Sequence, residues 1–352
     1  MNQPAFFGLM NWRLLFERLS FLTIVAGLAL YALWPWIPGT RAIPTRTLVV
    51  YGFSILGEVM SEGIFPAFQS EWEMRRGESL QFISSFAGSG TVTNQMILGV
   101  PAEVGVLSLE LDALRLVKAG VLRGPTWRQL PYAGVLNRTP FIILVRPGNP
   151  KGIHGFSDLA RPGIGVVHPD PLTSGGANWA IVAEYGAASR HSPDPAQAGY
   201  QLLLGIWRNV VAQAASARAA RTQFENGFGD ALITYEQEAI RDLARGRLRA
   251  EIVYPRSTIF SEHTLVVVDK NIAIEQRELV EAFVAFLWSD PAQSIFVKFG
   301  YRSMNETLNE SNLLFGHIQD PFLIRDFGDW PQAKREIVDA IWKNRVLQEI
   351  GQ

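Results

Sequence analysis

The strongest constraint on the fold is a unit that recurs along the chain: an apolar stretch of strand length, a turn of small or hydroxyl-bearing residues, and a stretch with helical spacing. Parallel strands need a long crossover between them, and a helix is the usual one. The repeated unit therefore predicts an α/β protein with mainly parallel sheets. Its turns are Gly52-Phe53-Ser54, Ala87-Gly88-Ser89-Gly90-Thr91, Thr173-Ser174-Gly175-Gly176-Ala177 and Thr234-Tyr235-Glu236.

These turns place the first N–H groups of a helix at the carboxyl end of a strand. The N–H groups have no partner inside the helix, and the helix dipole favours negative charge there. Glycine leaves its N–H unshielded, while Ser or Thr adds a hydroxyl donor. The two glycine-rich turns, 87–91 and 173–177, are therefore candidate anion sites. A Ser or Thr at a helix start also serves as a simple N-cap, and glycine as ordinary turn chemistry.

Composition limits the chemistry that these turns can serve. The 352 residues, 48% of them hydrophobic, are enough for two lobes or two domains. Thirty-two basic against 33 acidic residues create no field for nucleic acid, and the absence of cysteine excludes disulfides and thiolate chemistry. The five histidines have no metal-ligand spacing and are expected to be surface or turn residues: His154, His168, His191, His263 and His317. We expect no metal, no cofactor and no nucleic-acid partner.

The motifs of common enzymes are incomplete in this chain. The turn AGSGT lacks the lysine of a phosphate-binding P-loop, and neither it nor TSGGA completes the dinucleotide fingerprint. The segment GFSILG is not the G-x-S-x-G elbow of a serine hydrolase. The sequence therefore predicts no catalytic residues and a protein that is not an enzyme.

The N-terminal part contains a long apolar segment. Residues 19–38 carry no charge and are long enough to cross a hydrocarbon layer of roughly 30 Å as a helix. The positive-inside rule would keep residues 1–18, with Arg13 and Arg18, in the cytoplasm and the rest of the chain outside. We expect a membrane anchor here, with a cleaved signal segment or a buried core helix as the alternatives.

Longer segments of the chain carry a family resemblance. FISSFAGSGTVTNQMI, VPAEVGVLSLELDALRLVKAGVL, FIILVRPGNPKGIHGFSDLARPGIGVVHPDPLTSGGANW and TQFENGFGDALITYEQEAI resemble the periplasmic sulfate- and thiosulfate-binding proteins of ABC importers. The resemblance covers nearly everything after residue 47. It implies a two-lobed type II periplasmic-binding fold that clamps a dehydrated oxyanion between its lobes. From the strand pattern we assign 47–138 to lobe 1, 139–258 to lobe 2 and 259–352 to the return into lobe 1.

The resemblance also implies ligand positions where the motifs match. Ser89 stands at a hydroxyl donor position between Gly88 and Gly90, and the second loop contributes Ser174, Gly175 and Gly176. Ala217 matches a main-chain donor position in the other half of the site. Tyr235 stands where the family offers a tryptophan N–H, and its O–H can also donate.

The departures from the family bear on the choice of ligand. Gly52 replaces an aspartate, and the segment from Phe86 to Thr91 replaces His-Gly-Gly-Ser-Gly-Lys. Neither glycine-rich loop contains a carboxylate, which disfavours phosphate because phosphate keeps a proton that needs an acceptor. Glu236 would weaken this argument if it pointed inward, but a helix-start glutamate beside the dipole is expected instead. Arg218 is expected at the surface, with charge complementarity to the ligand as the alternative.

The function implied is that of an extracytoplasmic, monomeric binding protein. It would capture a tetrahedral oxyanion, sulfate or thiosulfate, and deliver it to an ABC permease. Molybdate or tungstate as ligand, or a membrane-anchored anion sensor or scaffold that uses the same cleft, remain the alternatives.

Overall fold

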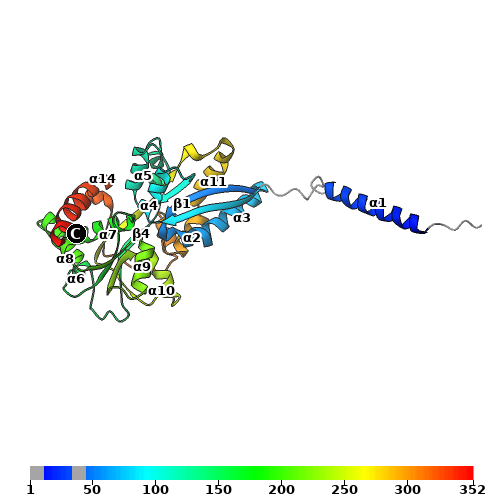
Figure 1. The fold of residues 1–352 in the computed structure, drawn as a ribbon. Helices are drawn as coiled ribbons and strands as arrows, with labels where there is room; N and C mark the ends of the chain where they lie inside the picture. Colours follow the sequence, from blue (N-terminus) through cyan, green and yellow to red (C-terminus); the bar gives the residue numbers. More distant parts are fainter. Residues whose placement is uncertain (1–11, 34–44, 352) are drawn as a thin grey trace, which may run out of the picture.

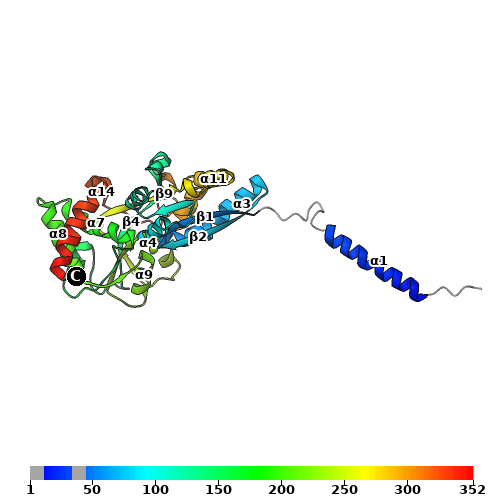
Figure 2. The same cartoon turned by 45° about the horizontal axis from the view of Figure 1, so that its top comes forward.

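The computed structural model describes residues 12–33 and 45–351 of the chain. Its first helix, α1 (Trp12–Leu33), lies apart from a two-lobed body (Figure 1 and Figure 2). Among the described residues, no helix combines the length and the apolar character that a membrane crossing requires. The segment predicted to cross the membrane, residues 19–38, continues beyond Leu33 into residues outside the described ranges.

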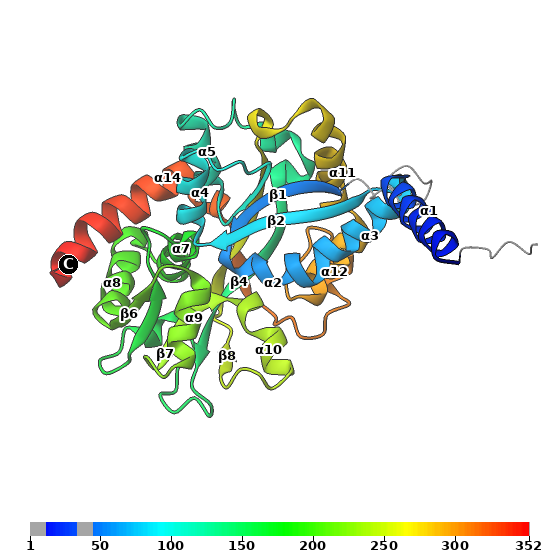
Figure 3. The same ribbon diagram turned by 45° about the vertical axis from the view of Figure 1, so that its right-hand side comes forward.

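One sheet of ten described strands runs through both lobes. Its order is β2-β1-β3-β9-β4-β7-β5-β6, with β10 paired to β9 and β8 paired to β4. The strands are β1 (Thr45–Phe53), β2 (Ser79–Ala87), β3 (Val104–Leu107), β4 (Val135–Val145), β5 (Val166–Pro169), β6 (Val210–Ala214), β7 (Ala231–Tyr235), β8 (Glu251–Val253), β9 (Ser257–Val267) and β10 (Asp320–Phe322). We call the part around β1, β2 and β3 the first lobe and the part around β5 to β8 the second lobe (Figure 3).

Strand direction differs between the lobes and their connection. The strands β1, β2 and β3 are parallel to one another, as are β5, β6 and β7. The long strands β4 and β9 run antiparallel to each other and to β7 and β3. The prediction of mainly parallel sheets is therefore correct within each lobe and wrong for the connection, because the chain leaves the first lobe on β4 and returns on β9 in the opposite direction.

The core explains why the short strands read as apolar runs. Every residue of β3, β5 and β7 is buried. Strands of a parallel sheet with both faces covered show continuous apolar runs rather than alternation. Their side chains pack into one large hydrophobic cluster that spans both lobes and into two smaller hydrophobic clusters, one in each lobe.

Helices cover both faces of the two lobes (Figure 3). The described α-helices of the body are α2 (Gly57–Val59), α3 (Phe65–Arg76), α4 (Ser89–Ile97), α5 (Glu110–Lys118), α6 (Phe156–Leu159), α7 (Gly175–Ser189), α8 (Pro195–Arg208), α9 (Ala217–Glu225), α10 (Ile240–Ala244), α11 (Arg277–Leu287), α12 (Asp290–Lys298), α13 (Glu306–Asn309), α14 (Trp330–Ala333) and α15 (Leu347–Ile350). Two segments have π-type pairing: η3 (Met60–Ile64) and η10 (Lys334–Val346). Short 3-10 turns are η2 (Ser54–Leu56), η4 (Thr126–Gln129), η5 (Pro131–Gly134), η6 (Glu236–Glu238), η7 (Asp269–Asn271), η8 (Ile274–Gln276) and η9 (Ile324–Phe327).

The C-terminal helix forms a third link between the lobes. The elements α14, η10 and α15 follow one another without a break, and Figure 3 shows them running from the first lobe, beside α5, to the second lobe. There η10 packs on α7 and α8. Trp330 packs edge-on against Trp179 of α7, and Trp342 against Trp207 of α8. The last part of the predicted return segment, 259–352, therefore lies against the second lobe.

Candidate functional site

Three loops that precede helices meet where the two lobes face each other. They lead into α4, α7 and α9, and each follows a strand of the sheet. The N–H of Gly90 donates to the carbonyl oxygen of Thr173 at 3.1 Å, and the Thr173 hydroxyl donates to the carbonyl oxygen of Ala215 at 3.0 Å. The N-terminal ends of three helices are thereby brought to one place.

Gly88 and the glycines of the second loop are required by close packing. A Cβ atom on Gly88 would lie 2.5 Å from the carbonyl oxygens of both Thr173 and Ala215. A Cβ atom on Gly175 would lie 2.4 Å from Leu109, and one on Gly176 would lie 2.9 Å from the Tyr235 hydroxyl oxygen. At Gly88 the obstacle is main chain, so no side chain fits there, whereas at Gly175 and Gly176 a side chain would displace neighbouring side chains.

The electrostatics of this meeting point favour an anion. The helices α4, α7 and α9 carry no acidic residue in their first turns. Each contributes N–H groups without a partner in its own helix, together with the positive end of its dipole. Ser174, Gly175 and Gly176 are all buried at the start of α7, and Ala217 is buried at the start of α9. The arrangement can hold a small dehydrated anion with main-chain donors.

The Ser89 hydroxyl is engaged differently from the prediction. It donates to Asp112 Oδ2 at 2.6 Å and accepts the N–H of Ser108 at 3.0 Å. A serine hydroxyl has one proton to donate, and here it is donated in the hydrogen bond to the Asp112 carboxylate. The expected role of this hydroxyl as a ligand donor therefore does not fit the geometry, and only the main-chain N–H of Ser89 is left for an anion.

Asp112 is a carboxylate near the site that the sequence analysis missed. Burial raises the pKa of Asp112, although hydrogen bonding from Ser89 and the charge of Arg115 oppose this. Its second oxygen accepts from Arg115 Nη1 at 3.0 Å. Each oxygen thus has a protein donor, so the carboxylate is held in place by Ser89 and Arg115. Its place in the first turn of α5, five residues after the end of β3, was the available signal.

Tyr235 and Ser108 form a hydroxyl pair across the lobes. Their oxygens lie 2.8 Å apart, and both residues are buried. The indole Nε1 of Trp179 donates to the Ser108 carbonyl oxygen at 2.7 Å. Burial raises the pKa of Tyr235, so the phenol stays protonated. Sequence reasoning selected Tyr235 but missed Ser108, which directly follows β3 at the same edge of the sheet.

Two charged residues next to the site, Glu236 and Arg218, form ion pairs with other side chains of the protein. Glu236 is fully buried, and its two oxygens accept from Arg302 at 2.7 and 2.9 Å. It is therefore held by an arginine of the return segment, 259–352, and is more than a helix-start residue beside the dipole. Arg218 lies at the surface with its side chain partly exposed, and it forms an ion pair of 2.8 Å with buried Glu238, so it is paired rather than freely solvated. Burial raises the pKa of Glu238.

A cavity of about 220 Å³ opens beside the first turn of α7. Ser174, Asn178 and Asp112 line it, and the cationic side chains of Arg115 and Lys334 stand among the other lining residues. The Asn178 Oδ1 atom is buried and has no hydrogen-bond partner in the described part of the chain. The cavity extends the polar surface of the site toward solvent.

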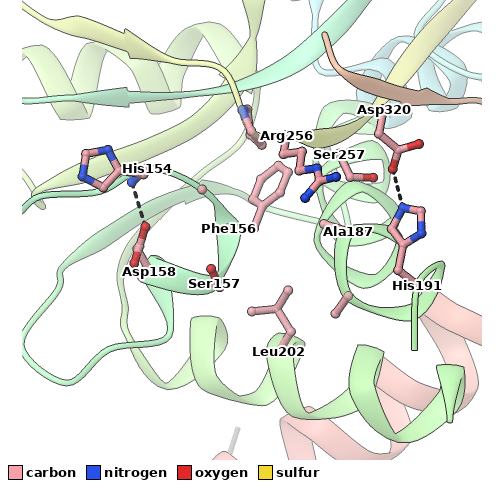
Figure 4. A pocket seen from close by; sticks show the side chains of 13 residues that line it. His154, Phe156, Ser157, Asp158, Ala187, His191, Leu202, Arg256, Ser257 and Asp320 are labelled. Atoms are coloured by element: carbon pink, nitrogen blue, oxygen red, sulfur yellow. Dashed lines mark hydrogen bonds and ion pairs between the residues drawn. The ribbon is translucent and has the colours of Figure 1, made fainter. Parts of the chain in front are cut away.

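A wider pocket of about 660 Å³ shares none of these residues (Figure 4). His154 and His191 line it, each beside an aspartate: the His154 N–H donates to Asp158, and His191 Nε2 lies 2.7 Å from Asp320 Oδ2. Within residues 12–33 and 45–351, no cluster of three or more His, Cys, Asp or Glu side chains is placed to hold a metal ion.

The five histidines divide into two groups. His154, His191 and His317 are exposed, as expected. His168 and His263 are fully buried, so the expectation of surface histidines is wrong for these two. His168 contacts Glu184 at 3.1 Å, and His263 contacts Asn137 Oδ1 at 2.6 Å. A polar partner for each ring explains how it is tolerated in the core.

Comparisons with known proteins show the family to which the chain belongs. Residues 48–302 match the family model of bacterial extracellular solute-binding proteins. The chain is 33% identical to a sulfate-binding protein of Synechococcus elongatus, over 87% of either chain. It is 30% identical to a thiosulfate-binding protein of Pseudomonas aeruginosa, covering 89% of this chain and 92% of that one.

A solved structure gives the same result for the fold. The sulfate-binding protein of Mycobacterium tuberculosis superposes with a TM-score of 0.75 at 30% identity, covering 82% of this chain and 98% of that one. The chain therefore belongs to the bacterial extracellular solute-binding proteins, in the family of the periplasmic sulfate- and thiosulfate-binding proteins.

Proposed function

We propose that this protein captures a tetrahedral oxyanion, sulfate or thiosulfate, outside the cytoplasm and delivers it to an ABC permease. The observation that carries the proposal is the convergence of the α4, α7 and α9 N-termini at the boundary between the lobes. A fully ionised tetrahedral anion requires donors only, and this place offers main-chain N–H groups and hydroxyls. The nearby carboxylates Asp112 and Glu236 are already occupied by protein donors.

The ligand residues follow from this arrangement. We assign main-chain donors to Ser89, Gly175, Gly176 and Ala217, and a hydroxyl donor to Ser174. Gly88 and Gly90 allow the first loop to approach the second, and Tyr235 contributes from the end of β7. Removing water from the anion strengthens each of these donors, because the local dielectric is low. The site needs no catalytic group, and binding without turnover is the activity we propose.

Capture and release correspond to closing and opening of the lobes. We divide the body into 47–138 and 259–352 for lobe 1 and 139–258 for lobe 2, and the last part of 259–352 crosses over and packs on lobe 2. The contact of Gly90 with Thr173 and that of Ser108 with Tyr235 join the two lobes, so they exist only in the closed form. An anion that touches donors from both lobes favours that form. Opening at the permease would release it.

We further propose that a monomer acts as the carrier and that residues 19–38 anchor it outside the cytoplasm. The uncharged sequence and the exposed apolar side chains of α1, such as Leu22 and Leu28, support this. An anchor would raise the concentration of the protein around its permease. Retention in the membrane pellet after carbonate extraction is the expected result, and recovery in the soluble fraction would refute the anchor.

Isothermal titration of the full-length protein with sulfate, thiosulfate, molybdate and phosphate tests the main proposal. We expect micromolar or tighter binding of sulfate or thiosulfate and weaker binding of phosphate. Gly175→Asp should abolish binding, since its side chain would collide with Leu109 and bring a negative charge to the helix end. Gly155→Asp is the matched control, because nothing lies within 4 Å of its Cβ position. Absence of binding in the wild type refutes the function.

A further inference from the structure

Ser108 is the residue at which the two lobes hold each other inside the site. Its N–H donates to Ser89 Oγ on its own lobe at 3.0 Å. Its carbonyl oxygen accepts from Trp179 Nε1 at 2.7 Å, and its hydroxyl lies 2.8 Å from that of Tyr235, both on the second lobe. Only 1% of its surface is exposed. The position of the Ser108 side chain is therefore fixed from both sides.

Counting protons leaves one hydroxyl proton without a partner. Ser108 and Tyr235 carry one hydroxyl proton each, and the hydrogen bond between them uses one of the two. No other partner of either hydroxyl occurs in the described part of the chain. The phenol keeps its proton, because burial raises the pKa of Tyr235. Either hydroxyl can be the donor within the pair, and the other hydroxyl then has the proton that is free to donate elsewhere.

Both hydroxyl oxygens lie against the first turn of α7. A Cβ atom on Gly175 would lie 2.8 Å from Ser108 Oγ, and one on Gly176 would lie 2.9 Å from the Tyr235 oxygen. The N–H groups of this turn are those assigned above to the anion. The spare hydroxyl proton is therefore beside the turn that carries these N–H groups. The Ser89 hydroxyl cannot donate to the anion, since it already donates its one proton in a hydrogen bond to Asp112.

We infer that Ser108 is a further ligand-binding residue, and that Ser108 and Tyr235 act as one unit that donates a single hydroxyl proton to the bound anion from either oxygen. This inference rests on the proposed function. A hydroxyl that accepts a hydrogen bond while it donates another is polarised and donates more strongly. The pair is thus a stronger donor than either hydroxyl alone, and each hydroxyl can replace the other.

A double-mutant cycle on sulfate binding tests the inference. In Ser108→Ala or Tyr235→Phe, the surviving hydroxyl still donates to the anion, so we expect a loss of affinity of only a few-fold. The double variant has neither hydroxyl and loses a hydrogen bond to a charged group, which corresponds to a loss of roughly 10- to 150-fold. The combined loss should therefore exceed the product of the two single losses.

Two control variants remove a serine hydroxyl and a tyrosine hydroxyl outside the proposed site. Ser189→Ala deletes a buried hydroxyl that has no hydrogen-bond partner in the described ranges, and Tyr200→Phe deletes a phenol that contacts Glu349. Both should bind sulfate like the wild type. Thermal unfolding of each variant separates a change in binding from a change in folding.

A second comparison covers the case in which the double variant fails to fold. In the Tyr235→Phe background, Ser108→Thr and Ser108→Val give side chains of nearly the same shape, of which only threonine has a hydroxyl. Any packing cost against Gly175 is shared by both. We expect the Thr variant to bind sulfate at least about tenfold more tightly than the Val variant, as for loss of a hydrogen bond to a charged group.

The outcomes distinguish the inference from the function. If the wild type binds none of the anions, the proposed function fails and the inference falls with it. If the wild type binds sulfate but the losses in the cycle simply multiply, or the Thr and Val variants bind equally, the inference is refuted and the function stands. Greater-than-multiplicative loss with unchanged controls supports the shared donor.

Discussion

The ring of Phe86 occupies the space that a side chain at position 52 would need. A Cβ atom on Gly52 would lie 2.9 Å from Phe86 Cε1 and 3.0 Å from Cδ1. The absence of a side chain on β1 accommodates an aromatic ring near the end of β2. Positions 52 and 86 are paired residues in the register of these strands.

Gly52→Asp should therefore destabilise the protein, whereas the same change in a Phe86→Ala background should cost less. The single variant forces overlap with the ring and buries a carboxylate, and overpacking alone costs about 1–3 kcal/mol. Chemical denaturation of the four members of the cycle measures the coupling. Equal costs of Gly52→Asp in both backgrounds would contradict the pairing.

Gly88→Ala should weaken anion binding more than it lowers folding stability. The added methyl group would lie 2.5 Å from two carbonyl oxygens of the second lobe, so it obstructs closure, while the open form avoids the contact. We expect at least about tenfold weaker sulfate binding, equivalent to 1.4 kcal/mol. Gly124→Ala, with nothing within 4 Å of its Cβ position, should bind normally. Normal affinity in Gly88→Ala would show that the closed contact is not required.

An ion pair across the lobes is expected to stabilise the closed form. Arg241 Nη1 lies 2.5 Å from Glu58 Oε1 and its guanidinium stacks 3.9 Å above the Phe299 ring. Arg241→Met keeps the length of the side chain and removes the charge. We expect a few-fold weaker sulfate binding, and a smaller effect at high salt, because salt screens the pair in the wild type. Arg208→Met removes an exposed arginine paired with Glu349, as the control.

The free energy of unfolding should decrease as the pH is lowered, because of His263. Burial among Phe53, Tyr235 and Tyr301 lowers the pKa of His263 from 6.5 to about 3. Below pH 6.5 the unfolded chain binds a proton that the folded chain does not, so stability declines toward pH 3 by up to about 1.4 kcal/mol per pH unit.

Thermal midpoints between pH 7.5 and 4 test this expectation, with His263→Gln predicted to give a shallower decline than the wild type. His154→Gln is the matched control because His154 is exposed. A decline in His263→Gln as steep as that in the wild type would assign the acid sensitivity to other groups.

The local units of the fold could be predicted, whereas their assembly could not. The turns at 87–91 and 173–177 follow strands and begin helices, as their glycines and hydroxyls indicated. Ala217 has no such signature and was found only through the family resemblance. The hydroxyl of Ser89 was misassigned because its acceptor, Asp112, is 23 residues away in sequence.

Long-range contacts also account for the other errors. Ser108 and the two buried histidines have polar partners on different elements: Tyr235 lies 127 residues from Ser108, and Asn137 lies 126 residues from His263. Sequence patterns report which face of an element is apolar, but not which polar group meets another across a boundary. The antiparallel connection was missed for the same reason, since strand direction depends on where the chain must return.

The C-terminal helix sets the kind of movement that the two lobes can make. Two neighbouring strands, β4 and β9, form a ribbon that alone could both bend and twist. The helix from Trp330 to Ile350 is attached to the first lobe beside α5 and to the second along α7 and α8, so it holds the lobes at a second place. Bodies held at two separated places keep one axis of rotation. We therefore expect each opening to follow the same path and each closing to return the donors of both lobes to the same positions.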